Sequence, residues 1–480
     1  MASALSDVPS GLVAPDDVNG LVPQLWPESA HRDAAGRLVV GGLDAATLAA
    51  RFGTPLYVVD EDEARGRARR TRLAFESAAA AAGTDVTVYY AGKAFLSGAV
   101  VRWVTEEGLA VDVCTGGELA VALGAGVDPA RIGFHGNNKS LAEIDAAVAA
   151  GVGAIVIDSE IEIERVAAAA ARAGRRQRVR LRVNSGVHAS THEFLATAHE
   201  DQKFGVSLDR AAELGARIRG HESLEFLGLH CHIGSQIFEA PGFAESASRL
   251  LAAHAELSAA APVPELNLGG GFGIAYTAAD SPQPIEDIAR GILDAVVAGC
   301  RERGLPVPKL AFEPGRSIIG PAGVTLYTVG TIKAVPIDGG ERRYVSVDGG
   351  MSDNARTALY EAQYSARLAS RTSAAAPALS RVVGKHCESG DIVVDAEYLP
   401  ADTGPGDLLA VPATGAYCWS LSSNYNHVPR PPVVAVREGS ARVIVRGETI
   451  DDLLARDLGL EPTAIDTAAT GDAATEGTPA

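Results

Sequence analysis

Eight short apolar stretches alternate with alanine-rich stretches between residues 86 and 313, and this alternation limits the possible folds more than any other feature. The apolar stretches have the length and residue types of buried strands, and most of the stretches between them are long enough for helices. The expected strands are Val86–Ala91, Leu109–Val113, Arg131–His135, Ala154–Asp158, Val179–Asn184, Leu224–Ile233, Glu265–Gly269 and Lys309–Glu313. Eight strands in this arrangement predict a parallel (β/α)8 barrel, although a doubly wound open sheet would alternate in the same way.

Nearly every expected strand ends at, or just before, a residue that can take part in chemistry. These residues are Lys93, Asp112, His135, Asp158, Asn184, His232, the glycines Gly269–Gly271, and Glu313 with Arg316. The carboxyl ends of the strands of a (β/α)8 barrel converge on one site, so these side chains would meet there. Their distribution therefore favours the barrel over the open sheet.

The helical pattern stops after Pro321, and short strand-like stretches separated by Gly, Pro and Asp follow. They are Val324–Val329, Arg343–Val347, Arg381–Val383, Ile392–Val394, Leu408–Val411, Pro432–Arg437 and Ala441–Arg446. This pattern predicts a second, antiparallel β domain, a sandwich or a barrel. We expect an N-terminal arm (1–33), N-terminal strands that join the β domain (34–60), the barrel (61–322), the C-terminal β domain (323–462) and a disordered tail (463–480).

The overall charge and the cysteines limit the class of protein. A net charge of −18 and a pI near 5.1 argue against nucleic acid or an anionic membrane surface as a partner. The N-terminus shows no signal-peptide pattern, and no apolar stretch approaches the length of a membrane span. The five cysteines are widely spread and never form a CxxC pair, which is typical of a reducing compartment. We expect a cytoplasmic enzyme.

Lys93 lies in the stretch VTVYYAGKAF and is one of only six lysines, beside 36 arginines. A lysine at the end of an apolar strand can be desolvated, which lowers the pKa of its amine and suits it to form a Schiff base with an aldehyde. The alternative is a lysine that caps a strand end in water. This stretch alone does not decide between them.

Two stretches after the last expected barrel strands could bind an anion and a cationic ring. The glycines of LNLGGGFG would let backbone N–H groups approach a phosphate, although the stretch does not match a GxGxxG dinucleotide loop. In FEPGRSI, Glu313 could keep a pyridinium nitrogen protonated. The alternative for Glu313 is an ion pair with Arg316 across the turn.

The remaining reactive side chains also allow two readings. His230 and His232 in HCHIGSQ could be metal ligands, but no third ligand stands at a suitable spacing, so we predict no metal. His232 stacked on a flat cofactor, with Ser235 at its phosphate, agrees better with the other motifs. In GKHCESGD, Cys387 is either an inert small side chain or, beside His386, an acidic thiol that can transfer a proton.

Taken together, these motifs resemble those of the fold type III pyridoxal-phosphate-dependent decarboxylases, which have an alanine racemase-like barrel, and most closely the diaminopimelate decarboxylase family. The matching stretches are YYAGKAF, DVCTGGEL, HGNNKS, QKFG, HCHIGSQ, LNLGGGFG, EPGR, VDGGMSDNARTALY, CESGD and GAYCWSLSSNYN, in family order over roughly residues 35–460. The resemblance implies pyridoxal 5'-phosphate as cofactor and meso-2,6-diaminopimelate as substrate. The implied products are carbon dioxide and L-lysine, in the last step of lysine biosynthesis.

The resemblance also implies roles for individual residues. The implied catalytic residues are Lys93, His232, Glu313 and Cys387, with Lys93 holding the cofactor as a Schiff base and Cys387 donating a proton. The cofactor would be bound by Lys93, His232, Ser235, Gly271, Glu313, Pro314, Gly315, Arg316 and Tyr417. The substrate would be bound by Arg316, Arg356, Tyr360, Glu388 and Tyr417. In the family, Cys387 and Glu388 reach the site from the partner subunit, which implies a homodimer with shared active sites.

Two other functions compete with this interpretation. A decarboxylase of another basic amino acid or of a carboxylated polyamine (ornithine, arginine or carboxynorspermidine) would need an acidic pocket but no arginine pair, so Arg356 favours diaminopimelate. A non-catalytic homologue would not require Lys93, Glu313 and Cys387. An alanine racemase relative would leave CESGD unexplained.

The chain departs from the family pattern at three places. Phe95 stands where the family commonly has Asn, Leu195–Ala198 (LATA) replaces an STG-like stretch, and Ser185 replaces a frequent proline. None of these changes removes a residue with an implied catalytic role. The loop that carries Lys93 and the loop after the fifth strand could therefore differ in shape.

Overall fold

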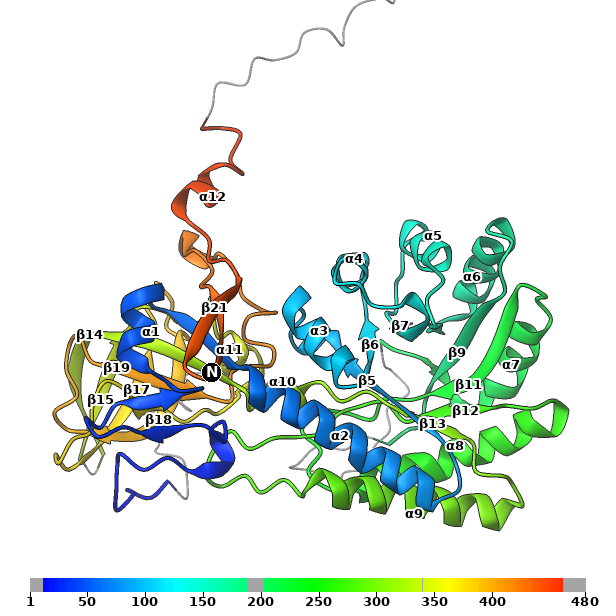
Figure 1. Cartoon of the computed structure of the whole chain (residues 1–480), viewed down its shortest axis with the longest axis horizontal. Coiled ribbons are helices and arrows are strands. Elements are labelled where there is room, and N and C mark those ends of the chain that lie inside the picture. The colour runs from blue at the N-terminus through cyan, green and yellow to red at the C-terminus, as the bar shows by residue number, and fades with distance from the viewer. Residues whose placement is uncertain (1–11, 188–202, 339, 461–480) are drawn as a thin grey trace, which may run out of the picture.

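A closed barrel and a second β domain make up the chain in the computed structural model, which describes residues 12–187, 203–338 and 340–460. The barrel forms the right-hand part of Figure 1 and the second domain the left-hand part. The eight principal strands of the barrel are β5 (Val86–Ala91), β6 (Ala110–Val113), β7 (Ile132–Phe134), β8 (Ala154–Ile157), β9 (Gln177–Asn184), β11 (Leu224–His230), β12 (Glu265–Asn267) and β13 (Lys309–Phe312). The predicted (β/α)8 fold is therefore confirmed.

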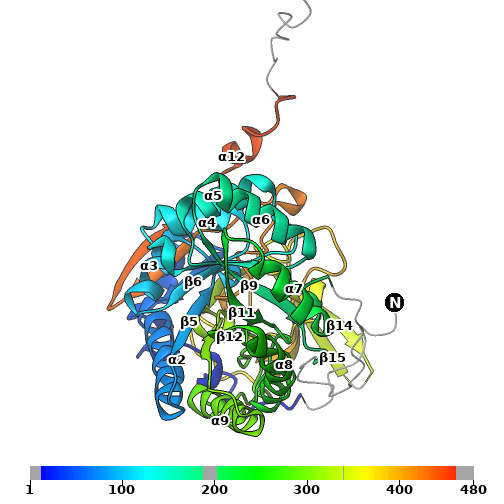
Figure 2. The same ribbon diagram turned by 90° about the vertical axis from the view of Figure 1, so that its right-hand side faces the viewer.

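Every neighbouring pair of these strands is parallel, and the ring closes where β13 pairs with β5 and β8 pairs with β9. A short strand, β10 (Val206–Ser207), pairs with β9 beside the ring. Figure 2 shows the helices around the strands. They are α2 (Glu61–Ala81), α3 (Gly98–Glu106), α4 (Gly116–Gly124), α5 (Leu141–Ala150), α6 (Glu160–Arg172), α7 (Ala211–Arg219), α8 (Pro241–Ala260) and α9 (Ile285–Arg303). Because helices cover the outside and side chains fill the inside, strands such as β7 and β8 are buried along their whole length.

Polar residues fix where several barrel helices begin. Helices α3, α4 and α5 begin directly after Ser97, Thr115 and Ser140, whose side chains accept a hydrogen bond from the first turn. Ser140 and Glu143 form a complete capping box. The turns that lead from strand to helix at the carboxyl end of the barrel are thus fixed locally.

The second domain contains a mixed sheet with the strand order β18-β17-β15-β14-β4-β20-β21, and β19 pairs with β14 and β16. Its strands are β4 (Leu56–Asp60), β14 (Gly323–Ile337), β15 (Gly340–Val347), β16 (Arg367–Leu368), β17 (Pro377–Val383), β18 (Ile392–Pro400), β19 (Leu408–Pro412), β20 (Val433–Arg437) and β21 (Ser440–Val445). Most pairs are antiparallel as expected, but β15 with β17 and β4 with β20 are parallel. The β15 to β17 connection spans residues 348–376 and includes α11 (Arg356–Tyr360), which is long enough for the crossover that parallel strands require.

The N-terminal segments divide between two sheets. β4 lies within the sheet of the second domain, whereas β2 (Leu38–Val40) forms a small antiparallel sheet with β1 (His31–Arg32) and β3 (Leu43–Asp44). Both sheets contribute to one apolar cluster, together with Leu25 and Trp26 of the expected arm and Leu48 of α1 (Ala45–Phe52). The arm is therefore packed from about residue 18, because Val18, Leu25 and Trp26 are buried.

The C-terminal helix α12 (Ile450–Leu454) extends away from the body of the molecule (Figure 1). The tail expected at residues 463–480 lies outside the described residues. In the part of the chain that is described, every helix is too short or too polar to cross a bilayer.

Phe75 of α2 joins the helical layer to the barrel, because its ring stacks on Phe312 of β13 with a centroid distance of 4.1 Å. Its side chain is fully buried. We expect Phe75→Ala to lower the free energy of unfolding by about 3–5 kcal/mol, because the substitution leaves a cavity in a packed core. Urea denaturation followed by circular dichroism measures this loss. The matched control is Leu73→Ala on the same helix, whose side chain is 48% exposed and whose loss should cost about 0.5 kcal/mol or less.

Candidate active site

Lys93 lies at the carboxyl end of β5, in the single turn Gly92–Ala94. Its side chain is exposed. Desolvation lowers the pKa of Lys93, but the charges of Asp112 and Glu313 contribute to a net rise. The expectation of a lowered pKa is therefore wrong, because the carboxylates at the ends of neighbouring strands stabilise the ammonium form.

Glu313 follows β13, and its buried carboxylate is bound from three other strands. His230 Nε2 lies 3.1 Å from Oε2, His135 Nε2 lies 3.3 Å from Oε1, and Asn267 Nδ2 donates to Oε1 at 2.7 Å. Burial by itself would raise the pKa of Glu313, but the two histidines outweigh it and hold this pKa well below its usual range. Glu313 is therefore an anion in the centre of the barrel mouth.

Asp112 at the end of β6 is the second buried carboxylate of this group. Its Oδ1 has no hydrogen-bond partner among the described residues and lies 3.8 Å from His135 Nε2. Burial raises the pKa of Asp112 to about 6, against the attraction of His135. The two carboxylates thus have opposite pKa shifts, since hydrogen bonds hold Glu313 and leave Asp112 Oδ1 without one.

His232 follows the end of β11 and stays neutral. Burial, with the positive charges of Lys93 and Arg182, keeps the pKa of His232 well below its ordinary value. The N–H of Gly270 donates to His232 Nδ1 at 3.4 Å. In the neutral ring Nε2 therefore carries the proton.

The glycines after β12 leave no room for side chains. A Cβ at Gly270 would lie 2.0 Å from the carbonyl oxygen of Glu313, and one at Gly271 would lie 2.5 Å from that of Gly234. Gly269 and Gly271 also have φ angles of +70° and +115°, which favour glycine. At this point no side chain of the glycine stretch covers the backbone. Uncovered backbone N–H groups suit a bound phosphate.

Pro314 and Gly315 connect Glu313 to the loop that carries Lys93. The N–H of Ala91 donates to the carbonyl oxygen of Pro314 at 3.0 Å. A Cβ at Gly315 would lie 2.9 Å from the carbonyl oxygen of Ala91. The segments that follow β13 and β5 are therefore packed backbone against backbone.

Arg316 and Tyr417 extend the site toward the second domain. Arg316 Nη2 donates to Ser235 Oγ at 2.8 Å, Nη1 donates to the Tyr276 hydroxyl, and the guanidinium lies 4.6 Å from the centre of the Tyr417 ring. The N–H of Tyr417 donates to Ala94 O at 2.7 Å, next to Lys93. Arg316 does not form the alternative ion pair with Glu313 among the described contacts, because tyrosine and serine hydroxyls hold it.

Arg356 brings a second guanidinium to the same tyrosines. It begins α11, is buried, and lies 4.6 Å from the Tyr276 ring centre and 5.9 Å from that of Tyr417. Its Nη1 donates to the hydroxyl of Tyr364. Two arginines and three tyrosines thus form a cationic, aromatic-lined group beside the lysine loop.

Three of the predicted residues are not part of this group within one chain. Cys387 and Glu388 are exposed on the second domain, and Tyr360 is 66% exposed. No hydrogen bond, ion pair or ring contact joins them to the barrel residues in the described ranges. The neighbour of Cys387, His386, is buried with Nδ1 2.9 Å from Asp391 Oδ2.

Sequence reasoning named His135 and His230 but did not assign either of them to Glu313. His230 and His135 meet Glu313, and their ligand atoms lie within 4.8 Å of one another. The expectation that His230 has no further ligands nearby is therefore wrong, although its partners are His135 and Glu313 and not His232. The contacts of both histidines with the Glu313 carboxylate are of hydrogen-bonding length. Asn267, Tyr276 and Tyr364 carry no sequence signal, although Asn267 stands directly before the glycine stretch.

The departures from the family pattern have structural counterparts. Phe95 is buried, and its ring packs edge-on against Trp419 with a centroid distance of 5.3 Å. Ser185 is buried, and its hydroxyl accepts from Ser246 Oγ at 3.1 Å. Leu195–Ala198 lie outside the described residues.

Comparisons with known proteins agree with this site. The family "Pyridoxal-dependent decarboxylase, pyridoxal binding domain" matches residues 68–320. The diaminopimelate decarboxylase of Mycobacterium tuberculosis is 52% identical over 447 residues, which cover 91% of this chain and 98% of the relative. That of Bacillus subtilis is 43% identical and covers 90% of this chain and 97% of the relative. The crystal structure of diaminopimelate decarboxylase from M. jannaschii in complex with L-lysine superposes with a TM-score of 0.84 at 31% identity, covering 90% of this chain and 98% of that one.

The barrel with Lys93 and Glu313 at its mouth, together with the match over residues 68–320, places the chain among the fold type III pyridoxal-dependent decarboxylases. Identity of 52% over nearly the whole length of a relative narrows this class. The chain belongs to the diaminopimelate decarboxylase family.

The raised pKa of Asp112 predicts how stability depends on pH. Its ordinary value is 3.8 and its folded value is about 6, so the folded protein binds a proton that the unfolded chain has released between these pH values. Stability should therefore fall as pH rises through this window. We expect Asp112→Asn to remove this fall. The difference in the free energy of unfolding between wild type and variant should then change by about 1–3 kcal/mol from acid to neutral pH. Urea unfolding of both apoproteins measures it.

Asp294→Asn on α9, where the carboxyl group is exposed, is the matched control and should show a constant difference at all pH values. A difference that is equally constant for Asp112→Asn would contradict the prediction.

Proposed function

We propose that this protein decarboxylates meso-2,6-diaminopimelate to L-lysine and carbon dioxide with pyridoxal 5'-phosphate, as the last step of lysine biosynthesis. One observation carries the substrate: Arg316 and Arg356 both lie against Tyr417, whose N–H is bonded beside Lys93. A substrate whose amine is bound at Lys93 would therefore extend its other end toward two guanidinium groups. The names of the relatives support the same substrate.

The residues at the barrel mouth fit the cofactor. Lys93 would hold it covalently through Nζ, His232 would stack on its ring, and Glu313 would pair with the ring nitrogen. The bare backbone at Gly271, Pro314 and Gly315, with Ser235, Arg316 and Tyr417, would bind its phosphate. When bound, the cofactor supplies an electron sink for the pair of electrons that the leaving carboxylate releases.

Glu313 is suited to its role because it is held as an anion. A neighbouring anion stabilises a protonated ring nitrogen, and a protonated nitrogen withdraws electrons more strongly. Three contacts fix the carboxylate, and among the described residues Oε2 has only His230 as a hydrogen-bonding contact. Oε2 can therefore accept one further hydrogen bond.

The arginine pair would select the substrate. A guanidinium binds a carboxylate through two parallel hydrogen bonds, and Arg316 and Arg356 would hold the distal carboxylate of diaminopimelate in this way. Tyr360 would contact the same end. A substrate without a distal carboxylate would leave the half-buried Arg316 and the buried Arg356 without this partner, which is strongly unfavourable.

We infer that the working unit is a homodimer with shared sites. Cys387 would return a proton to the carbon that lost its carboxylate, and Glu388 would bind the distal amine. Both residues are exposed and have no described contact with the barrel group of their own chain, which supports delivery from a partner subunit. We also propose a cytoplasmic location, since all five cysteines are free thiols.

Two measurements test the proposed function: the absorbance spectrum of the holoenzyme and the release of carbon dioxide from candidate substrates. The purified holoenzyme should absorb near roughly 410–430 nm, as pyridoxal Schiff bases do, and Lys93→Ala should lack this band and carbon dioxide release. Release should occur from meso-diaminopimelate and not from L-ornithine or L-arginine. Release from ornithine or arginine would keep the cofactor chemistry and refute the substrate.

Arg356→Lys tests the arginine pair more sharply. It keeps the charge but loses the planar fork, so kcat/KM for diaminopimelate should fall about a hundredfold or more, with the absorbance band unchanged. Arg456→Lys, an exposed position near α12, is the control and should match the wild type.

The shared site is tested by complementation between inactive subunits. Lys93→Ala and Cys387→Ala homodimers should each be inactive, whereas equal mixing and reassociation should restore about a quarter of wild-type activity. The reason is that half of the dimers are then mixed, and each contains one intact site. Absence of recovery in heterodimers verified by two affinity tags would refute the shared site.

A further inference from the structure

A second cavity, of about 550 Å³, lies at the amino-terminal end of the barrel strands. Its lining includes the first residues of β5, Ala110 at the start of β6, and Glu265 and Lys309, which begin β12 and β13. Lys93 and Glu313 follow the opposite ends of β5 and β13. The cavity therefore lies at the other mouth of the barrel, and its volume is typical of small-molecule sites.

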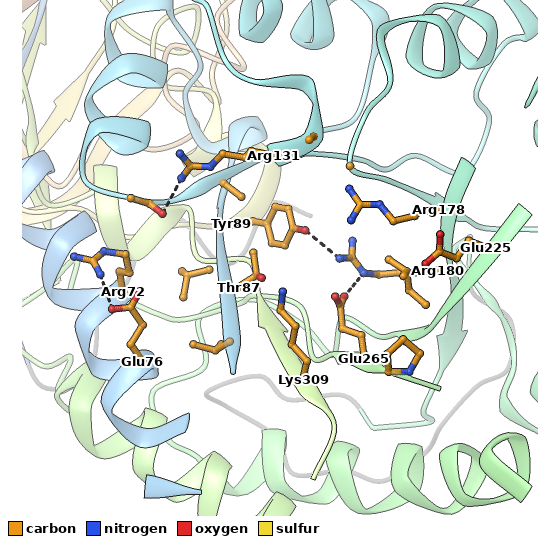
Figure 3. Close-up of a pocket in the computed structure, with 18 residues that line it drawn as sticks. Arg72, Glu76, Thr87, Tyr89, Arg131, Arg178, Arg180, Glu225, Glu265 and Lys309 are labelled. Atoms are coloured by element: carbon orange, nitrogen blue, oxygen red, sulfur yellow. Dashed lines mark hydrogen bonds and ion pairs between the residues drawn. The ribbon is translucent and has the colours of Figure 1, made fainter. Parts of the chain in front are cut away.

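The cavity is basic although the protein as a whole is acidic. Five cationic side chains line it, against three carboxylates, in a chain of net charge −18. The cations are Arg72, Arg131, Arg178, Arg180 and Lys309, and the carboxylates are Glu76, Glu225 and Glu265. Figure 3 shows Arg178, Glu225 and Glu265 beside Arg180, with Arg72 and Glu76 on the opposite side of the view. A concave surface of one sign concentrates ions of the opposite charge.

Two of the carboxylates are already neutralised. Glu76 pairs with Arg72, and Glu265 pairs with the buried Arg180. Arg131 donates Nη2 to the carbonyl oxygens of Gly108 and Leu109, both at 2.8 Å, and its positive charge is not cancelled. Glu225 is therefore the one lining carboxylate that offsets the positive charge of the unpaired cations.

Three donors in the cavity wall lack partners among the described residues. Arg178 and Lys309 make no recorded hydrogen bond or ion pair there, and both are exposed. Arg180 is only 2% exposed, and its Nη1 has no hydrogen-bond partner, although Nη2 donates to the Tyr89 hydroxyl at 3.0 Å. Arg178 and Lys309 are therefore the two donors that an anion in the cavity can reach directly, because Arg180 Nη1 has almost no exposed surface.

We propose that this cavity binds a small oxyanion with two or more negative charges, a phosphate or a dicarboxylate. Arg178 and Lys309 contact it from the rim, where both side chains are exposed. The excess positive charge that remains after pairing matches the charge of such an anion.

Gly133 and the Tyr89 ring lie between this cavity and the proposed active site. A Cβ at Gly133 would lie 3.4 Å from the Tyr89 ring and 3.5 Å from His135 Nε2, so Gly133 stands between the cavity wall and the group that holds Glu313. Binding at the cavity can therefore be measured in the holoenzyme, whose own phosphate cradle is filled.

The experiment is isothermal titration of the holoenzyme with inorganic phosphate, pyrophosphate and succinate. We expect saturable binding of at least one of them, and the difference between the phosphates and succinate identifies the chemistry. Arg178→Gln with Lys309→Gln should weaken this binding at least about tenfold, because two charged hydrogen-bond donors are lost. Glu225→Gln should strengthen it severalfold, a change that a merely damaged protein would not show.

Lys333→Gln with Arg456→Gln removes the same charge from exposed positions outside the cavity and is the control. It should bind as the wild type does. The absence of saturable binding at millimolar concentrations, or equal affinity in the cavity and control variants at equal melting temperature, would overturn the proposal. The absorbance band of the holoenzyme, which depends on Lys93, reports separately on the active site. Failure of the proposed anion site therefore does not imply failure of the proposed decarboxylase function, and the reverse also holds.

Discussion

The carboxylate of Glu313 is the point on which the architecture of the barrel mouth depends. It is fully enclosed, and an ion there persists only because His135, His230 and Asn267 reach it from three other strands. Removing an ion from water costs several kcal/mol unless donors replace the lost hydration. The barrel supplies those donors because its parallel strands end at one level around one axis. An open sheet would not bring them together.

Asn267 connects this anion to the proposed phosphate cradle. Its amide nitrogen donates to Glu313, and its oxygen accepts from the N–H of Gly269 at 2.8 Å. Because one side chain fixes both groups, the distance between the ring nitrogen and the phosphate of a bound cofactor would be set by the scaffold. The second domain adds the other wall, where Tyr417 is bonded to the lysine loop and lies against both arginines.

Much of the fold could be predicted from the sequence. Strand β5 matches its expected bounds to the residue, because the composition changes sharply at both of its ends. The second domain was harder. β14 runs to Ile337, beyond the expected Val329. Its second half was not recognised because it is largely exposed, mixes polar with apolar residues and pairs only with β15 among the described strands. The parallel pairs β15 with β17 and β4 with β20 could not be predicted, since local pattern carries no information about the partner of a strand.

The site divides in the same way. By itself, the sequence determined which chemical groups end the strands, because the switch from apolar to polar residues is local: Lys93, Asp112, His135 and Glu313 can all be read from it. Only the tertiary structure decided what each group does. It set His135 and His230 against Glu313, it raised the pKa of Lys93 through carboxylates at neighbouring strand ends, and it assembled Arg316, Arg356 and Tyr417 from distant segments. The physical reason is that charge, desolvation and hydrogen bonding act through space, over a few ångströms, between residues that lie up to hundreds of positions apart in the chain.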